Sequence, residues 1–257
     1  MTNSKSKKSK LIVVVGGTGG IGLEAAKLFL LNGEKVCITH YENPYQAKEI
    51  VSQKIAPQTK ADNCFLYQMD LENDTSVNNV FQKIRQDQGN IDVVVFAATA
   101  PINPKPFSGK EWKDFNKHIN IQVKGLFSVV KGVMEQIKEK HKTKFIILIT
   151  EGCVGVPPLY LSDYITAKYG LMGLAKSLAI ELAKYNCRVN MISPGMTETN
   201  LLSGFPQKVV EMTAFQNPLK RIANPKDVAN VALFLASDDS DYLNGVNITV
   251  NGGSVMF

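Results

Sequence analysis

The sequence predicts a Rossmann-type α/β fold, in which a doubly wound sheet of about seven mostly parallel strands carries helices on both faces. Two features of the 257-residue chain predict it. Short runs rich in Val and Ile, with little alternation of polar residues, are typical of strands buried on both faces of a parallel sheet. Helical patterns separate these runs almost throughout, which is the arrangement of repeated β-α-β units.

The individual elements follow from this pattern in chain order. Strands are expected at residues 11–15, 35–39, 64–69, 91–97, 144–150, 188–192 and 246–250. Helices are expected at residues 20–31, 76–86, 112–140, 164–185 and 225–237. Gly33 fits the end of the first helix, and Pro225 fits the first position of the last one. Neither a linker nor an internal repeat divides the chain, so residues 11–257 are expected to form one domain.

Charge and cysteine usage exclude several classes of partner. The formal net charge is +6, and four lysines lie in the first ten residues, so residues 1–10 are expected to be a disordered basic tail on a mildly basic body. No basic motif with interleaved aromatic residues follows, which excludes a typical nucleic-acid partner. No stretch approaches the ~20 apolar residues of a membrane span. The four cysteines form no CxxC pair, so we expect no metal site and a cytoplasmic location with reduced thiols.

Two irregular segments, residues 99–111 and 195–217, follow the carboxyl ends of predicted strands. Ligands bind at that edge of a doubly wound sheet. The second segment begins with a Pro-Gly step and contains an apolar stretch, so it is expected to be a mobile substrate lid. The alternative is an ordinary surface connection.

A glycine-rich turn between the first strand and the first helix predicts a dinucleotide site. Glycines allow a tight turn and close approach of a pyrophosphate to the positive end of a helix. The residues expected to contact the cofactor there are Gly16, Thr18, Gly19, Gly20, Ile21 and Gly22. No carboxylate stands at His40, where the second strand ends, so NADPH is favoured over NADH. His40 could donate a hydrogen bond to a 2′-phosphate, or be a plain loop residue.

Tyr164 and Lys168 lie four residues apart and therefore share one face of a helix. An ammonium group near a tyrosine stabilises the phenolate and moves its pKa from ~10 towards neutral pH. Such a tyrosine can donate a proton to a carbonyl oxygen. Beside a dinucleotide site, the pair predicts hydride transfer between a nicotinamide and a carbonyl or alcohol.

Together, the glycine turn, Tyr-x-x-x-Lys and the later Pro-Gly step resemble the short-chain dehydrogenase/reductase superfamily, and its 3-oxoacyl-carrier-protein-reductase-like members in particular. The resemblance extends over residues 11–257. It implies Tyr164 as the proton donor, Lys168 on the nicotinamide ribose, and a homotetramer or homodimer. It also implies further cofactor contacts at Asp70, Leu71, Ala97, Ala98, Thr99, Pro194, Gly195 and Thr199.

The sequence departs from the family pattern at three places. Residues 96–99 replace the family's Asn-Asn-Ala-Gly, and Gln122 replaces its catalytic asparagine. Glutamine carries the same amide and could still hold the water of a proton relay. Glu151 replaces the serine that bonds the substrate oxygen. Protonated Glu151 could donate a hydrogen bond as serine does, ionised Glu151 could act as a base, or Glu151 could point away and leave the task to Thr150.

These residues leave three functions open. The first is an NADPH-dependent reductase of a ketone, such as a β-ketoacyl thioester, which could be bound to a carrier protein. The second is a non-redox cyclase, dehydratase or isomerase that uses Tyr164 and Glu151. The third is a cofactor-binding protein with little catalysis.

Overall fold

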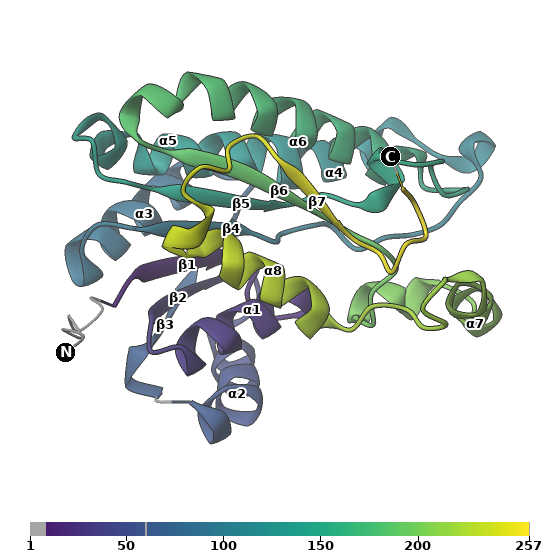
Figure 1. Ribbon diagram of the computed structural model, residues 1–257, viewed down its shortest axis with the longest axis horizontal. Coiled ribbons are helices and arrows are strands. Elements are labelled where there is room, and N and C mark those ends of the chain that lie inside the picture. The colour runs from purple at the N-terminus through teal and green to yellow at the C-terminus, as the bar shows by residue number, and fades with distance from the viewer. Residues whose placement is uncertain (1–8, 60, 257) are drawn as a thin grey trace.

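A computed structural model describes residues 9–59 and 61–256 of the chain (Figure 1). Its seven strands form one sheet in the order β3-β2-β1-β4-β5-β6-β7, and every neighbouring pair is parallel. The predicted Rossmann-type α/β fold is therefore confirmed. Among the described helices, none combines the length and apolar character that crossing a bilayer requires.

The elements lie close to their predicted positions. The strands are β1 (Leu11–Val15), β2 (Lys35–His40), β3 (Cys64–Gln68), β4 (Val93–Phe96), β5 (Lys144–Leu148), β6 (Arg188–Pro194) and β7 (Asn247–Val250). The helices are α1 (Gly20–Leu31), α2 (Pro44–Lys54), α3 (Asp74–Gln88), α4 (Trp112–Ile119), α5 (Gly125–Lys138), α6 (Ser162–Glu181), α7 (Gln207–Gln216) and α8 (Pro225–Ala236).

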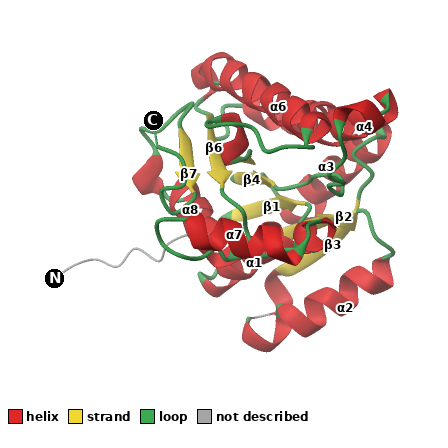
Figure 2. Cartoon of the chain, turned by 90° about the vertical axis from the view of Figure 1, so that its right-hand side faces the viewer, coloured by secondary structure: helices red, strands yellow, loops and turns green. Residues whose placement is uncertain are grey.

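Two helical layers cover the sheet, one on each face (Figures 1 and 2). Helices α3, α5 and α6 pack on one face, and α1 and α8 on the other. Successive residues of β1 serve the two cores in turn: Val13 and Val15 join the first, and Ile12 and Val14 join the second. This alternation follows from the two-residue period of a strand, and it explains the continuous apolar runs in the sequence.

Two helices were not predicted. Helix α2 buries only Ala47, and α7 buries none of its residues, so neither contributes much to the two cores. The signals for α2 were its cap, Asn43, which accepts a hydrogen bond from the Tyr45 amide, and Pro44 at its first turn. The expectation of an irregular 195–217 segment was wrong, because α7 occupies much of it.

The single helix expected at 112–140 is three consecutive segments. Helices α4 and α5 are separated by a π-helical stretch, Asn120–Lys124. Such wide turns are frequent at functional sites. The expected 164–185 helix begins two residues earlier, at Ser162, and ends at Glu181, followed by a short 3₁₀ turn and a left-handed Asn186.

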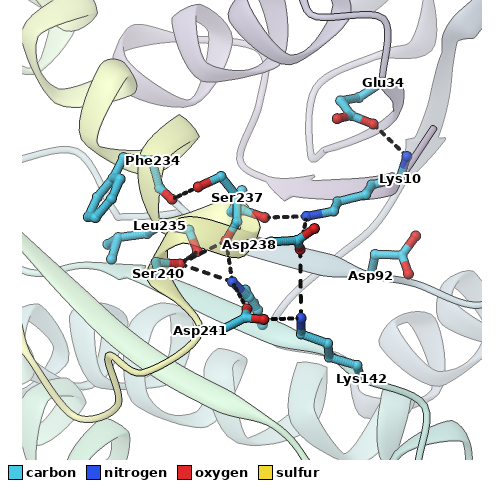
Figure 3. Close-up of polar contacts among 12 residues, drawn as sticks. Lys10, Glu34, Asp92, Lys142, Phe234, Leu235, Ser237, Asp238, Ser240 and Asp241 are labelled. Carbon is cyan, nitrogen blue, oxygen red and sulfur yellow. Dashed lines mark hydrogen bonds and ion pairs between the residues drawn. The ribbon is translucent and has the colours of Figure 1, made fainter. Parts of the chain in front are cut away.

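The amino-terminal edge of the sheet is held by paired charges (Figure 3). Residues 1–8 of the expected basic tail lie outside the described residues. Lys10, also assigned to the tail, is ordered: its Nζ donates to the Ala236 carbonyl at 2.9 Å and pairs with Asp238 at 2.9 Å. The tail prediction was therefore wrong at Lys10, because this side chain fastens β1 to the end of α8.

Lys144 is the most buried cation of this edge. Its Nζ donates to the Ser237 carbonyl and the Ser240 hydroxyl and lies 2.7 Å from Asp241 Oδ1. Lys142 pairs with the other carboxylate oxygen of Asp241 at 2.6 Å. Burial alone would raise the pKa of Asp241, but the two ammonium groups hold it at about 2. The contacts of Lys144 thus connect strand β5 to the turn that follows α8.

We expect Lys144→Met to lower the free energy of unfolding by about 1–3 kcal/mol, because it leaves the Ser237 carbonyl and Asp241 without a buried donor. The control is Lys142→Met, whose more exposed ion pair should contribute less than about 1 kcal/mol. Urea unfolding monitored by circular dichroism measures both. Equal losses in the two variants would contradict this account of Lys144.

Candidate active site

The glycine turn packs closely against the end of β4. Gly16 has a φ of +78°, and a Cβ atom there would lie 2.8 Å from the Ala98 Cα. A Cβ at Gly22 would clash with the Gly16 carbonyl oxygen, whereas the space around Gly19, which precedes α1, is open. The first turn of α1 carries no acidic residue. An open helix amino terminus whose own first turn carries no carboxylate fits the pyrophosphate of a dinucleotide.

The end of β2 differs from the sequence-based expectation. The His40 ring is buried, and its Nδ1 lies 3.0 Å from the Glu42 carbonyl oxygen. Two residues further on, the exposed Glu42 side chain turns back to the glycine turn, where both carboxylate oxygens accept from Thr18 Oγ1 at 3.0 and 3.1 Å. A carboxylate therefore stands beside the turn after all, although not at position 40.

The other expected cofactor residues lie at the carboxyl ends of three strands. Asp70 and Leu71 follow β3, Ala97 to Thr99 follow β4, and Pro194 and Gly195 end β6. Asp70 accepts from the Glu72 amide, which closes a local turn. The Thr199 side chain lies over the glycine turn, 3.1 Å from where a Cβ of Gly20 would be. The structure thus brings the 195–217 segment against the turn.

Helix α6 presents Tyr164 and Lys168 on one face. Lys168 Nζ lies 5.6 Å from the centre of the Tyr164 ring and donates to the Leu148 carbonyl at 2.7 Å. Burial lowers the pKa of Lys168 to about 7. Burial also raises the pKa of Tyr164, and a hydrogen bond from Thr150 opposes that rise only in part. The expected shift of the Tyr164 pKa towards neutral pH is therefore wrong for the protein without ligands, in which burial dominates and the phenol holds its proton.

Thr150 and Glu151 face different parts of the protein. The Thr150 side chain lies where it lowers the pKa of Tyr164, whereas the Glu151 carboxylate accepts from the Ser254 hydroxyl near the carboxyl terminus. Glu151 lines a cavity of about 410 Å³ together with Gly195 and Arg221, and the cavity wall includes parts of the 195–217 segment. Of the two side chains, that of Thr150 is the one that acts on the Tyr164 phenol.

Gln122 belongs to a buried polar group that the sequence did not indicate. The Gln122 side chain is fully buried, and its Nε2 lies 3.1 Å from His118 Nδ1. The His118 ring contacts Tyr164 edge-on, with ring centres 5.8 Å apart. On the other side, His118 Nε2 lies 4.0 Å from Asp163, which forms a 2.7 Å ion pair with Lys110.

Comparisons with known proteins agree with this architecture. A family model described as enoyl-(acyl carrier protein) reductase matches residues 16–255. The chain belongs to the short-chain dehydrogenase/reductase superfamily. It is therefore an oxidoreductase by family, and this family binds NAD or NADP.

Relatives of this family are similar over nearly their whole length. The chain is 31% identical to the 3-oxoacyl-acyl-carrier-protein reductase FabG of Thermotoga maritima, over 97% of this chain and 99% of that one. It is 30% identical to a 3α-hydroxysteroid dehydrogenase of Mediterraneibacter gnavus, over 96% and 97% of the two chains. The crystal structure of levodione reductase superposes with a TM-score of 0.86 at 24% identity, covering 95% and 96%, which shows the shared fold.

Sequence reasoning missed Glu42, His118, Asp163 and Lys110. Glu42 stands about twenty residues after the glycine turn, the spacing at which an acidic residue contacts ribose, but it lies beyond the strand end at which that residue was expected. His118 lies one helical turn before Gln122, a spacing that brings side chains together. Nothing in the sequence marks the pairing of Lys110 with Asp163, because loop and helix meet only in the fold.

We expect Thr150→Val to lower kcat/KM for carbonyl reduction by about 10-fold or more, since Tyr164 loses a hydrogen-bond partner. Glu151→Ser should leave reduction within about threefold, because its carboxylate is directed to Ser254. Initial rates over a range of pH measure both. The opposite ranking, with Glu151→Ser inactive and Thr150→Val unimpaired, would assign the chemistry to the carboxylate.

Proposed function

We propose that the protein is a nicotinamide-dependent ketoreductase that converts a ketone to an alcohol. The observation that carries this proposal is Tyr164, a protonated phenol held by Thr150 and facing Lys168 at the carboxyl edge of the sheet. When bound, the reduced nicotinamide supplies a hydride to the carbonyl carbon. Tyr164 donates its proton to the carbonyl oxygen, which completes the alcohol.

The surrounding residues support this step. Lys168, tied to the Leu148 carbonyl, keeps further N–H groups for the nicotinamide ribose. Its ammonium form favours the phenolate that remains when Tyr164 has given up its proton. The carboxamide of Gln122 takes the place of the family's asparagine amide. It holds the water through which a proton returns to the Tyr164 phenolate. We assign the binding of the substrate oxygen to Thr150 instead of Glu151, because Thr150 interacts with Tyr164, the proposed proton donor.

For the substrate, we propose a ketone on an acyl chain, such as a β-ketoacyl thioester, free or bound to a carrier protein. The similarity to the Thermotoga maritima reductase supports this class. The 410 Å³ cavity that the 195–217 segment borders is not lined by Tyr164 or Lys168, so it is a candidate only for the remote part of the acyl chain. Helix α7 within that segment buries no residue, as expected of a substrate lid. The similarity to a hydroxysteroid dehydrogenase makes a cyclic ketone the second class to test.

A non-redox reaction is the second candidate, because Glu151 is an ionisable group in the same cavity. Its hydrogen bond to Ser254 places the carboxylate in the carboxyl-terminal turn and favours reduction as the main activity. If the protein binds a cofactor but turns over no substrate, the third function is favoured, that of a cofactor-binding protein with little catalysis.

We also propose a cytoplasmic homodimer or homotetramer. The four cysteines are free thiols, which suits a reducing compartment. The outer surfaces of α5 and α6 expose Phe127, Tyr169 and Ile180, an apolar set that a second copy could cover.

The cofactor choice depends on Glu42. The lack of a carboxylate at position 40, taken alone, predicts a preference for NADPH. In the structure, however, the His40 ring is buried and its Nδ1 is hydrogen-bonded to the Glu42 carbonyl oxygen. The Glu42 carboxylate lies beside Thr18 in the glycine turn. A carboxylate there accepts from a ribose 2′-hydroxyl and repels a 2′-phosphate. We therefore propose that the protein prefers NADH, which reverses the preference drawn from the sequence.

Tyr164→Phe should lower kcat by about 100- to 10,000-fold, the range for loss of a general acid, and leave cofactor affinity nearly unchanged. Lys168→Ala should impair both, because the ammonium serves the phenol and the ribose. Tyr169→Phe, an exposed tyrosine on the same helix, is the control. Cofactor oxidation at 340 nm across ketones and acyl thioesters measures turnover. Activity retained in Tyr164→Phe would move the proton donor elsewhere.

Glu42→Ser should tighten NADPH binding by about 10-fold or more and weaken NADH binding by a few-fold, because it removes both the repulsion and the ribose acceptor. Calorimetric titration of each cofactor measures this without turnover. Glu49→Ser, an exposed glutamate on α2, is the matched control. If the unmodified protein binds NADPH more tightly and Glu42→Ser changes nothing, the preference predicted from position 40 stands.

A further inference from the structure

His118 is a buried histidine whose two ring nitrogens face different partners. Nδ1 lies 3.1 Å from the Gln122 amide nitrogen, one helical turn away, and Nε2 lies 4.0 Å from Asp163 Oδ2 on α6. Asp163 is itself engaged by Lys110, in an ion pair whose side chains are only 2% and 5% exposed. One side of the imidazole is therefore hydrogen-bonded to Gln122, and the other side faces Asp163 at a distance longer than a hydrogen bond.

The Gln122 contact determines which nitrogen of His118 carries the proton. An amide nitrogen only donates, so His118 Nδ1 must be the acceptor. A neutral ring then carries its proton on Nε2, directed to the Asp163 carboxylate. Burial lowers the pKa of His118; Asp163 opposes this, while the ammonium groups of Lys110, Lys168 and Lys117 add to it. The ring is thus neutral at physiological pH.

The same contact leaves the other end of the carboxamide free. Gln122 Oε1 is buried and has no hydrogen-bond partner among the described residues. Lys168, on the helix that packs against the π-helical stretch, has three N–H donors and one bond to the Leu148 carbonyl. An unused buried acceptor thus lies on the π-helical stretch and unused buried donors lie on α6, two elements that pack against each other. A bridging water would satisfy both.

We propose that neutral His118 is a positioning residue that holds the Gln122 carboxamide with its oxygen turned away from the imidazole, as the acceptor in the proton path to Lys168 and Tyr164. This inference rests on the proposed ketoreductase function. It assigns a role to a residue that does not itself touch the reacting atoms.

Protonation of His118 reverses this arrangement. A charged imidazole donates from Nδ1 as well, and an amide nitrogen cannot accept that proton. The carboxamide must turn over, so that Oε1 faces His118 and the amino group takes the place of the acceptor. The proton path then meets a donor where it needs an acceptor. Turnover should therefore fall in acid as His118 becomes charged.

The first test compares two substitutions of His118 through the pH dependence of kcat. His118→Asn can place Oδ1 near the position of Nδ1 without titrating, so kcat at pH 8 should stay within about threefold and the fall in acid should diminish. His118→Leu removes the acceptor, so kcat should drop by about 10-fold or more with KM nearly unchanged. His141→Asn, at an ion pair with Asp92, is the control. An unchanged acid limb in His118→Asn, or normal kcat in His118→Leu, would overturn the proposal.

The second test needs no activity. The chain has three histidines, so ¹⁵N spectra of the imidazoles can be assigned with single His→Asn variants. His118 should be protonated at Nε2 only, with a midpoint below that of free histidine. A proton on Nδ1 at pH 7, or a charged ring, would overturn the proposal even in an active enzyme. A protein that reduces no carbonyl would instead overturn the proposed function, and the spectrum would then decide the His118 orientation by itself.

Discussion

The hydrogen bond from Lys168 Nζ to the Leu148 carbonyl is the contact on which the rest of the site depends. It joins α6 to the end of β5 and so sets the height of Tyr164 above the sheet. The partner is a backbone oxygen, so the ammonium is held without an opposing charge. Burial can then lower the pKa of Lys168 to about 7, and the remaining N–H groups stay available to ligands.

The two edges of the sheet use buried charge in opposite ways. At the amino-terminal edge, Lys10 and Lys144 are matched with carboxylates and carbonyls, which stabilises the fold (Figure 3). At the carboxyl edge, Gln122 and Lys168 have hydrogen-bonding capacity that the chain itself does not use. Unused capacity is unfavourable in a folded protein unless a ligand or water supplies the partner. Stability and chemistry are therefore placed at opposite ends of the same strands.

Burial explains what could be predicted from the sequence. The strands and α1 were placed correctly because β1 and its neighbours are buried on both faces and appear as continuous apolar runs. Helix α7 was missed because it buries none of its residues. The position of Glu42 depends on the turn after β2. The orientation of Gln122 depends on its contact with His118 and on the π-helical stretch to which it belongs. Motifs indicated Tyr164 and Lys168 as the proposed catalytic pair, whereas the contacts of Glu42 and Gln122 exist only between side chains placed by the fold.

The π-helical stretch Asn120–Lys124 sets how α4 is rotated relative to α5. Each residue of an α-helix advances about 100° around the axis, and a wide turn takes up one more residue without adding that rotation. His118 can therefore face α6 while Leu126 still faces the sheet core. If the same residues formed a regular α-helix, α4 would be rotated by about 100° and His118 would turn away from Tyr164. The wide helical turn is itself part of the site, independent of which residues form it.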